Sequence, residues 1–352
     1  MPADFLKGVI GLYGPLQNAK RLLRCGAALA LAFLLCAGPR SFAAEVSGTG
    51  RMLVPVGHTV GIKLFSRGVL VVKLSDGGTP AKECGLQTGD VIVKCGGVTV
   101  RSTEQFQSLL QKTGEEPTDL QVRRGSQNMT LSVSPEPNEQ GGYSIGAWIR
   151  DSMAGIGTVT YYDPDTGDFG ALGHGITDVD TALLMPFSSG SILPSTVKAV
   201  KKGAAGDAGE LRGDFDLTQD LGDLSANTES GIFGTVEESP AVWQTSQALP
   251  AASAGEVRPG PATILSNVEG DEVRSYDIEI LKVVPGAADS RNMVLSVTDP
   301  ELIAATGGIV QGMSGSPILQ NGKLVGAVTH VLLNDPTKGY GIFIENMLNA
   351  AK

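Results

Sequence analysis

Apolar residues occur along this chain in short runs rich in Val, Ile and Leu, and Gly, Pro, Asn or Asp residues separate one run from the next. Runs of this kind are typical of β-strands. We expect strands at 60–64, 68–74, 119–123, 129–133, 231–236, 262–267, 273–280, 324–333 and 339–344. Apolar positions at helical spacing predict helices at 102–111 and 345–351. The pattern therefore predicts a mainly β protein.

Residues 1–44 follow a different pattern. Three basic side chains within 20–24 precede an apolar run at 25–38, and the small residues Ser41 and Ala43 follow. This order is that of a secretory signal peptide. The apolar run is shorter than the roughly 20 residues that a membrane-spanning helix needs. We expect a signal peptide, or alternatively a retained membrane anchor, and in both cases the remaining chain lies outside the cytoplasm.

A compact domain is predicted at 58–135, and a polar linker follows it. Before the helix at 102–111 the chain reads Gly85-Leu86-Gln87-Thr88-Gly89-Asp90-Val91-Ile92. This resembles a motif of PDZ domains. The resemblance implies that an extended peptide adds as a strand beside this helix, in a groove bordered by 61–64. The amides of Gly61 and Ile62 would then bind the peptide carboxylate; a PDZ-like domain without a ligand is the alternative.

Composition narrows the function classes. The chain has 352 residues, 47 of them Gly, and aromatic residues make up 5%. This suits a turn-dense β architecture of two or three domains. A net charge of −10 argues against a nucleic-acid-binding protein, which would present a basic face. No Cys-x-x-Cys, P-loop or dinucleotide fingerprint occurs in the sequence, so we expect no metal site and no cofactor. Cys84 and Cys95 could form a disulfide or remain thiols.

The strongest motif for chemistry lies near the C-terminus. It reads Gly312-Met313-Ser314-Gly315-Ser316-Pro317 and precedes two apolar runs that flank Asn321-Gly322, a hairpin turn signal. Glycines permit a tight turn that exposes the serine hydroxyl. Such a turn can also direct backbone N–H groups at one point, as in an oxyanion hole.

This region resembles the nucleophile segment of chymotrypsin-like serine proteases. The resemblance implies a trypsin-like double β-barrel over 143–352, with Ser314 as the nucleophile. It also implies that the amides of Gly312 and Ser314 form the oxyanion hole. The returning strand, which includes Thr329-His330-Val331, would line the substrate.

The sequence has three histidines, which limits the choice of a general base. His58 begins the PDZ-like segment, where we expect it to face solvent. His174 lies between two glycines and precedes Ser314, which is the chymotrypsin-like order. His330 is the rival, but it would lie on the substrate-lining strand. We therefore predict His174 as the base.

A buried carboxylate should orient the imidazole. Asp178 and Asp180 are close to His174 in sequence, whereas Asp299 preserves the order His, Asp, Ser. Asp299 is much nearer to its serine than the acid of chymotrypsin-like enzymes. From the residues alone the choice among the three stays open.

The combination of all these features is similar to the SpoIVB peptidases of endospore-forming bacteria. The resemblance rests on the signal segment, the PDZ-like domain and four motifs: Gly170-Ala171-Leu172-Gly173-His174, residues 306–318, residues 326–331 and residues 334–341. It implies that the enzyme cleaves itself and a membrane-bound sporulation regulator, and so triggers pro-sigma-K processing in the space between the forespore and mother-cell membranes. By position it assigns Ser314 as nucleophile, His174 as base and Asp299 as acid. Gly175 is a departure, because members of the family carry a bulkier residue there.

Two other functions are compatible with parts of the sequence. A PDZ-bearing envelope scaffold with an inactive protease-like domain would need no catalytic serine. An esterase would use a serine on a strand-to-helix elbow. The β-hairpin predicted after Ser314 argues against such an elbow.

Overall fold

The structure, a computed structural model, describes residues 48–238, 240–243, 247–287 and 290–352. The predicted signal segment at 1–44 lies outside these residues, as do Cys25 and Cys36. Residues 47–352 form one compact unit. Within the described ranges, no helix has both the length and the apolar character needed to cross a membrane.

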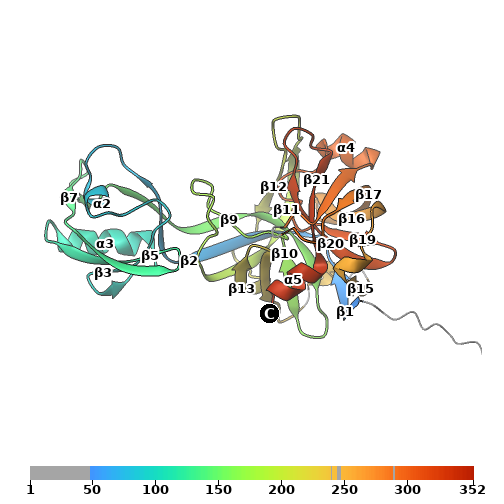
Figure 1. The fold of residues 1–352 in the computed structure, drawn as a ribbon, viewed down its shortest axis with the longest axis horizontal. Helices are drawn as coiled ribbons and strands as arrows, with labels where there is room; N and C mark the ends of the chain where they lie inside the picture. The colour runs from blue at the N-terminus through green and yellow to red at the C-terminus, as the bar shows by residue number, and fades with distance from the viewer. Residues whose placement is uncertain (1–47, 239, 244–246, 288–289) are drawn as a thin grey trace, which may run out of the picture. The chain divides into compact units, whose positions relative to one another are not determined.

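A small α+β part contains the PDZ motif (Figure 1). Its sheet continues from the second half of β2 (Thr59–Leu74) through β3 (Val91–Cys95) and β5 (Thr118–Arg124) to β6 (Gln127–Val133), all antiparallel. The other elements are α2 (Pro80–Glu83), β4 (Val98–Thr99), α3 (Thr103–Thr113), β7 (Glu136–Pro137) and β8 (Tyr143–Ser144). Ser102 caps α3 by accepting a hydrogen bond from the Gln105 amide, and Phe106 and Leu110 of α3 are buried against the sheet.

Two long strands connect this part to the rest of the fold. β2 and β9 (Ala147–Tyr162) pair antiparallel along most of their length. The first half of β2 also pairs with β11 (Phe187–Lys201), whereas its second half pairs with β3. Strand β2, which lies within the range 58–135 predicted for the PDZ-like domain, therefore contributes to both parts of the fold. Gly68 has a φ of 96° and lies at a break in the β2–β9 register, so the two strands predicted at 60–64 and 68–74 are one strand in the structure.

The first β-barrel closes in the order β2, β9, β10 (Asp168–Ala171), β14 (Gly231–Thr235), β13 (Gly222–Thr228), β11 and back to β2. Apolar side chains that alternate along these strands fill it, among them Val60, Val159 and Ile232. Trp243 of a 3₁₀ turn (Ala241–Trp243) packs edge-on against Phe169.

The second barrel closes in the order β16 (Gly260–Glu269), β17 (Glu272–Val283), β18 (Met293–Val297), β21 (Lys338–Phe343), β20 (Lys323–Val331), β19 (Pro317–Gln320) and back to β16. Its core contains Ile264, Ile280 and Met313. The remaining elements are β1 (Gly48–Pro55), β12 (Glu210–Phe215), β15 (Leu249–Ala252), a 3₁₀ turn (Ala254–Glu256), α4 (Pro300–Thr306) and α5 (Ile344–Ala350). The prediction of a mainly β fold with two barrels is confirmed.

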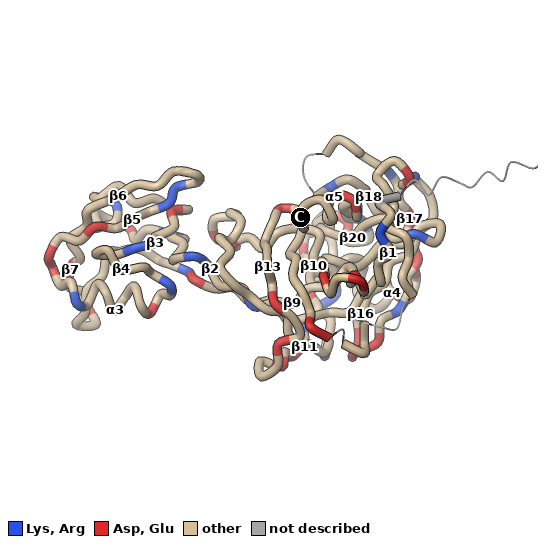
Figure 2. The backbone as a smooth tube through the Cα atoms, turned by 90° about the horizontal axis from the view of Figure 1, so that it is seen from below, with Lys and Arg blue, Asp and Glu red and all other residues tan. Residues whose placement is uncertain are grey.

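Strand β1 joins the two barrels, because it pairs with β9 of the first and with β15, which itself pairs with β20 of the second. Figure 2 shows acidic and basic positions interspersed along the backbone. His58 lies between β1 and β2 and is only 5% exposed, so the expectation that it faces solvent is wrong.

Candidate active site

The loop that carries Ser314 lies between α4 and β19, and β9 of the first barrel anchors it. The Thr158 amide donates to the Ser314 carbonyl at 3.0 Å, and the Thr158 hydroxyl donates to the Gly312 carbonyl at 2.7 Å. Gly315 has a φ of 99°, and a Cβ there would lie 1.9 Å from the Thr158 carbonyl oxygen. Glycine is therefore required where the nucleophile loop packs against β9.

Two backbone donors in the loop are not used by the fold. The amides of Met313, Gly315 and Ser316 donate to backbone carbonyls. Within the described part of the chain, the amides of Gly312 and Ser314 donate to none. These are the two amides predicted to form the oxyanion hole. An unpaired pair of N–H groups beside a serine hydroxyl is suited to bind a developing negative charge.

His174 follows β10 in a turn with left-handed backbone at Leu172 and Gly173, whose φ values are 68° and 69°. The imidazole Nδ1 lies 2.9 Å from the Gly175 carbonyl oxygen. As Nδ1 donates to this carbonyl, the neutral ring keeps the Nε2 lone pair for a proton. Burial lowers the pKa of His174, and the Gly175 carbonyl opposes this shift. The ring is therefore held in the form that a general base needs.

The structure explains why glycine occupies position 175. A Cβ at this position would lie 2.2 Å from the Leu184 Cδ1 and 2.5 Å from the Thr228 carbonyl oxygen. A bulkier residue at 175 therefore requires movement of the backbone that follows His174.

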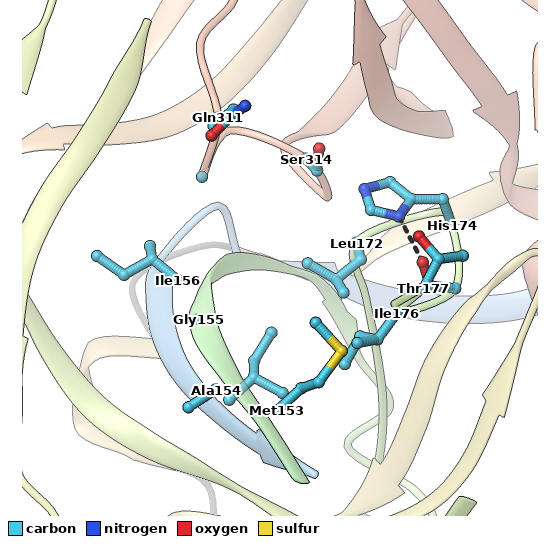
Figure 3. Close-up of a pocket in the computed structure, with 13 residues that line it drawn as sticks. Met153, Ala154, Gly155, Ile156, Leu172, His174, Ile176, Thr177, Gln311 and Ser314 are labelled. Carbon is cyan, nitrogen blue, oxygen red and sulfur yellow. Dashed lines mark hydrogen bonds between the residues drawn. The ribbon is translucent and has the colours of Figure 1, made fainter. Parts of the chain in front are cut away.

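His174 and Ser314 line the same cavity, which has a volume of about 260 Å³. Figure 3 shows both side chains at its rim, with apolar side chains from β9 and from the segment around His174 beneath them. The Ser314 hydroxyl donates to the Thr329 carbonyl at 2.7 Å. In structures without substrate, nucleophile and base are often not yet hydrogen-bonded to each other.

His330, the rival base, lies on β20 beside His174. The two rings are 5.0 Å apart between centroids and tilted by 37°. His330 is not among the residues that line the cavity. The structure thus brings His174, rather than His330, to the cavity that Ser314 faces.

None of the three candidate carboxylates is hydrogen-bonded to His174 in the described residues. Asp178 is fully buried and accepts hydrogen bonds from Arg150 and from the amide and hydroxyl of Thr181. Burial opposes its ionisation, but the Thr181 hydrogen bonds and the Arg150 charge hold the pKa of Asp178 below its usual range. Asp180 pairs with the same arginine.

Asp299 has a local role in the structure. Its carboxylate accepts from the amides of Glu301 and Leu302, both at 2.9 Å, and from the Asp277 amide at 3.3 Å. It is therefore the N-cap of α4, the helix that leads into the Ser314 loop. This arrangement differs from the prediction that Asp299 orients the imidazole. The sequence Asp299-Pro300-Glu301 is also a helix start signal, and the structure uses Asp299 in this way.

Gly61 and Ile62 are not in the PDZ groove, so this prediction is corrected. Both lie in the first half of β2 and pair with β9 and β11, and Ile62 lines the cavity of Ser314. The groove beside α3 is instead lined by Ser108 and Gln111 of the helix and by residues 143–145, 147 and 149. Its lining includes the segment Tyr143-Ser144-Ile145, which the sequence analysis places at the start of the peptidase domain.

Cys84 and Cys95 are free thiols. Burial raises the pKa of both thiols, so they are poor nucleophiles. No group of His, Cys, Asp or Glu side chains is arranged to hold a metal ion within 48–352, apart from the residues left undescribed there.

Both parts of the chain are similar to known proteins. A PDZ domain model matches residues 71–124. The serine protease HTRA1 of Xenopus tropicalis is 38% identical over 61 residues, which cover 17% of this chain and 13% of that protein. The chain spans no more than a fifth of the length of the curated relatives it matches.

Two solved structures are also similar. The PDZ domain of the SdrC-like protein from Listeria monocytogenes has 20% identity and a TM-score of 0.22, and the match covers 24% of this chain and 87% of that one. The active form of the Rv3671c protease from M. tuberculosis has 13% identity and a TM-score of 0.30, with 57% of this chain and 72% of that one covered.

The model of the SpoIVB peptidase S55 family matches residues 141–348, more than half of the chain. This range contains Ser314, His174 and both unpaired amides of the nucleophile loop. The chain therefore belongs to the SpoIVB peptidase S55 family.

Proposed function

We propose that this chain is an extracytoplasmic serine endopeptidase of sporulation signalling. Its substrates are a membrane-bound regulator and the chain itself, and cleavage of the regulator triggers pro-sigma-K processing. The family membership supports the pathway. One observation carries the chemistry: Ser314, His174 and the unpaired amides of Gly312 and Ser314 meet at one cavity.

The proposed reaction proceeds through an acyl-enzyme. His174 Nε2 takes the proton of the Ser314 hydroxyl as the oxygen attacks the scissile carbonyl. The amides of Gly312 and Ser314 bind the oxyanion, and the imidazolium then gives its proton to the leaving amine. A water molecule, activated by His174, then attacks the acyl-enzyme in the same way, which releases the acyl group and returns the proton to Ser314. Removal of one oxyanion donor typically costs about 10²–10³ in kcat.

The Gly175 carbonyl takes the place at Nδ1 that a carboxylate holds in a triad. It fixes the tautomer but adds no full negative charge. Asp299 affects the position of Ser314 indirectly, because it caps α4, the helix that precedes the nucleophile loop. We therefore assign Ser314 and His174 as catalytic residues and Asp299 as a positioning residue.

The experiment compares the full chain with Ser314→Ala and His174→Ala for self-cleavage and for labelling by a fluorophosphonate probe. Ser225→Ala is the matched control, since this serine is exposed and its hydroxyl donates a hydrogen bond to the Phe233 carbonyl, away from the cavity. We expect labelling in wild type and control, none in Ser314→Ala, and a loss of about 10³-fold or more in His174→Ala. Equal labelling of wild type and Ser314→Ala would refute the assignment.

The signalling role needs a separate test in sporulating cells that lack their own family member. Wild type should restore pro-sigma-K processing, and Ser314→Ala should not. One observation favours the scaffold alternative, namely that the Ser314 hydroxyl is bonded to the Thr329 carbonyl rather than to a base. A scaffold predicts normal signalling by Ser314→Ala and failure when Ser108→Trp blocks the groove beside α3.

A further inference from the structure

The cavity at Ser314 is lined mainly by apolar side chains, although the catalytic chemistry requires only polar groups. Met153 and Ile156 come from β9, Ile62 from β2, and Leu172 and Ile176 from the segments on either side of His174. Figure 3 shows Met153, Leu172 and Ile176 gathered below the imidazole, with Ile156 below Gln311. An apolar hollow with a few polar groups at its rim is the usual form of a site for an apolar ligand group.

The position of the cavity tells which part of a substrate enters it. The general acid of the second half-reaction must reach the leaving nitrogen, so the residue that carries this nitrogen passes next to His174. Residues 174–177 form one wall of the cavity, and Gln311 and Gly312 form part of another. On its other side Ser314 meets β20 through the Thr329 carbonyl, and β20 contributes no residue to the cavity lining.

We infer that this cavity is the subsite for the residue on the amine side of the scissile bond, and that it selects a bulky aliphatic side chain there. The inference rests on the proposed function, because it takes Ser314 and His174 as nucleophile and acid. A volume of about 260 Å³ accommodates a leucine or isoleucine side chain. No lysine, arginine, aspartate or glutamate is among the lining residues, so a charged side chain would lose water without gaining a partner.

The walls of the cavity are held by packing against buried residues. Met153 and Ile176 pack against a buried cluster of Leu64, Leu70, Val91 and Met185. At Gly157, the next position of β9 after Ile156, an added Cβ would lie 2.1 Å from the Leu172 side chain, so the strand cannot approach more closely with a larger residue. Hydrophobic pockets of this kind separate side chains by about 10- to 200-fold.

Partition of an acyl-enzyme tests this subsite by itself. The full chain reacts with 4-nitrophenyl acetate, which acetylates Ser314 and releases 4-nitrophenolate. Added amino acid amides then compete with water: the acetyl carbon–oxygen bond to Ser314 breaks, the carbon–nitrogen bond forms, and the amine proton passes through His174 to the serine oxygen. The ratio of acetylated amide to acetate measures occupancy of the amine-side subsite, whatever the preference for the acyl group.

We expect leucinamide to capture the acetyl group at least about 10-fold better than alaninamide or the α-amide of aspartic acid, whose side-chain carboxylate is free. Ile156→Ala and Met153→Ala should each reduce this ratio. Leu281→Ala is the matched control, because this leucine on β17 is 42% exposed and does not line the cavity, and it should leave the ratio unchanged.

The outcomes separate the two hypotheses. A Ser314-dependent burst with equal capture of the three amides overturns the subsite and leaves the proposed function standing. Preferential leucinamide capture that persists in both alanine variants also overturns it. Absence of a burst that depends on Ser314 overturns the proposed function, and the subsite with it.

Discussion

Replacement of Asp299 by asparagine distinguishes a helix cap from a triad acid. In the structure the carboxylate caps α4 through the Glu301 and Leu302 amides. Asparagine is as good an N-cap as aspartate, because its side-chain oxygen accepts the same hydrogen bonds. A triad acid behaves differently: its change to asparagine reverses the imidazole tautomer and lowers kcat about 10⁴-fold.

We therefore expect Asp299→Asn to retain acyl-enzyme formation within a few-fold of wild type. Asp299→Ala should lose about 0.5–2 kcal/mol of stability, the usual effect of removing a cap. For a domain of this size about 1 kcal/mol corresponds to a Tm decrease of roughly 2–4 °C. Its activity should fall as well, because α4 leads directly into the nucleophile loop.

The assay is the rate of fluorophosphonate labelling at fixed probe concentration, combined with thermal unfolding of the same samples. Asp216→Asn is the control, since Asp216 makes a similar local turn by accepting from the Thr218 amide and hydroxyl. A 10⁴-fold loss in Asp299→Asn with an unchanged Tm would refute the reasoning. It would mean that the carboxylate reaches His174 in the reacting enzyme.

Two further predictions follow from the geometry of the site. Burial lowers the pKa of His174, so the neutral imidazole persists as the pH falls through about 6.5, the usual pKa of histidine. The acid limb of the pH profile of kcat/KM should therefore have its midpoint below that pH. A midpoint at or above about 6.5 would contradict the burial of this ring. Gly315→Ala should lose more than about 2 kcal/mol in denaturant unfolding, because of its positive φ and its approach to the Thr158 carbonyl, whereas Gly255→Ala, which has open space, should unfold like wild type.

Most strands of the second barrel were predictable because they carry strong local signals, whereas in the first barrel only β2 and β14 were predicted. Alternating or continuous apolar runs between turn residues placed the strands around 262–280 and 324–344 close to their observed bounds. The nucleophile turn was equally clear, since glycines at 312 and 315 have positive φ values that few other residues tolerate. Local backbone chemistry was enough in these cases.

For the carboxylate and the PDZ groove, local signals were present but did not decide between competing assignments. Asp299 satisfied the expected chain order, but its side chain was already committed to the backbone amides that follow it. The groove depends on pairing between β2 and β9, whose partners are far apart in sequence. The spacing of residues in one sequence does not reveal such long-range pairing. The groove was therefore predicted beside the first half of β2, which belongs to the barrel.

The register of β2 and β9 has a consequence for how this protein could have arisen. Phe65 pairs with Ser152 and Leu70 pairs with Arg150, so the PDZ-like part occupies the tip of a β-hairpin that belongs to the first barrel. Hairpin tips are where insertions are best tolerated during evolution. A simpler ancestor could have closed this hairpin with a short turn. The inserted part now shares a buried apolar cluster with the first barrel, in which Val91 of the insert packs with Met185. Removal of the insert would therefore expose Met185 to water.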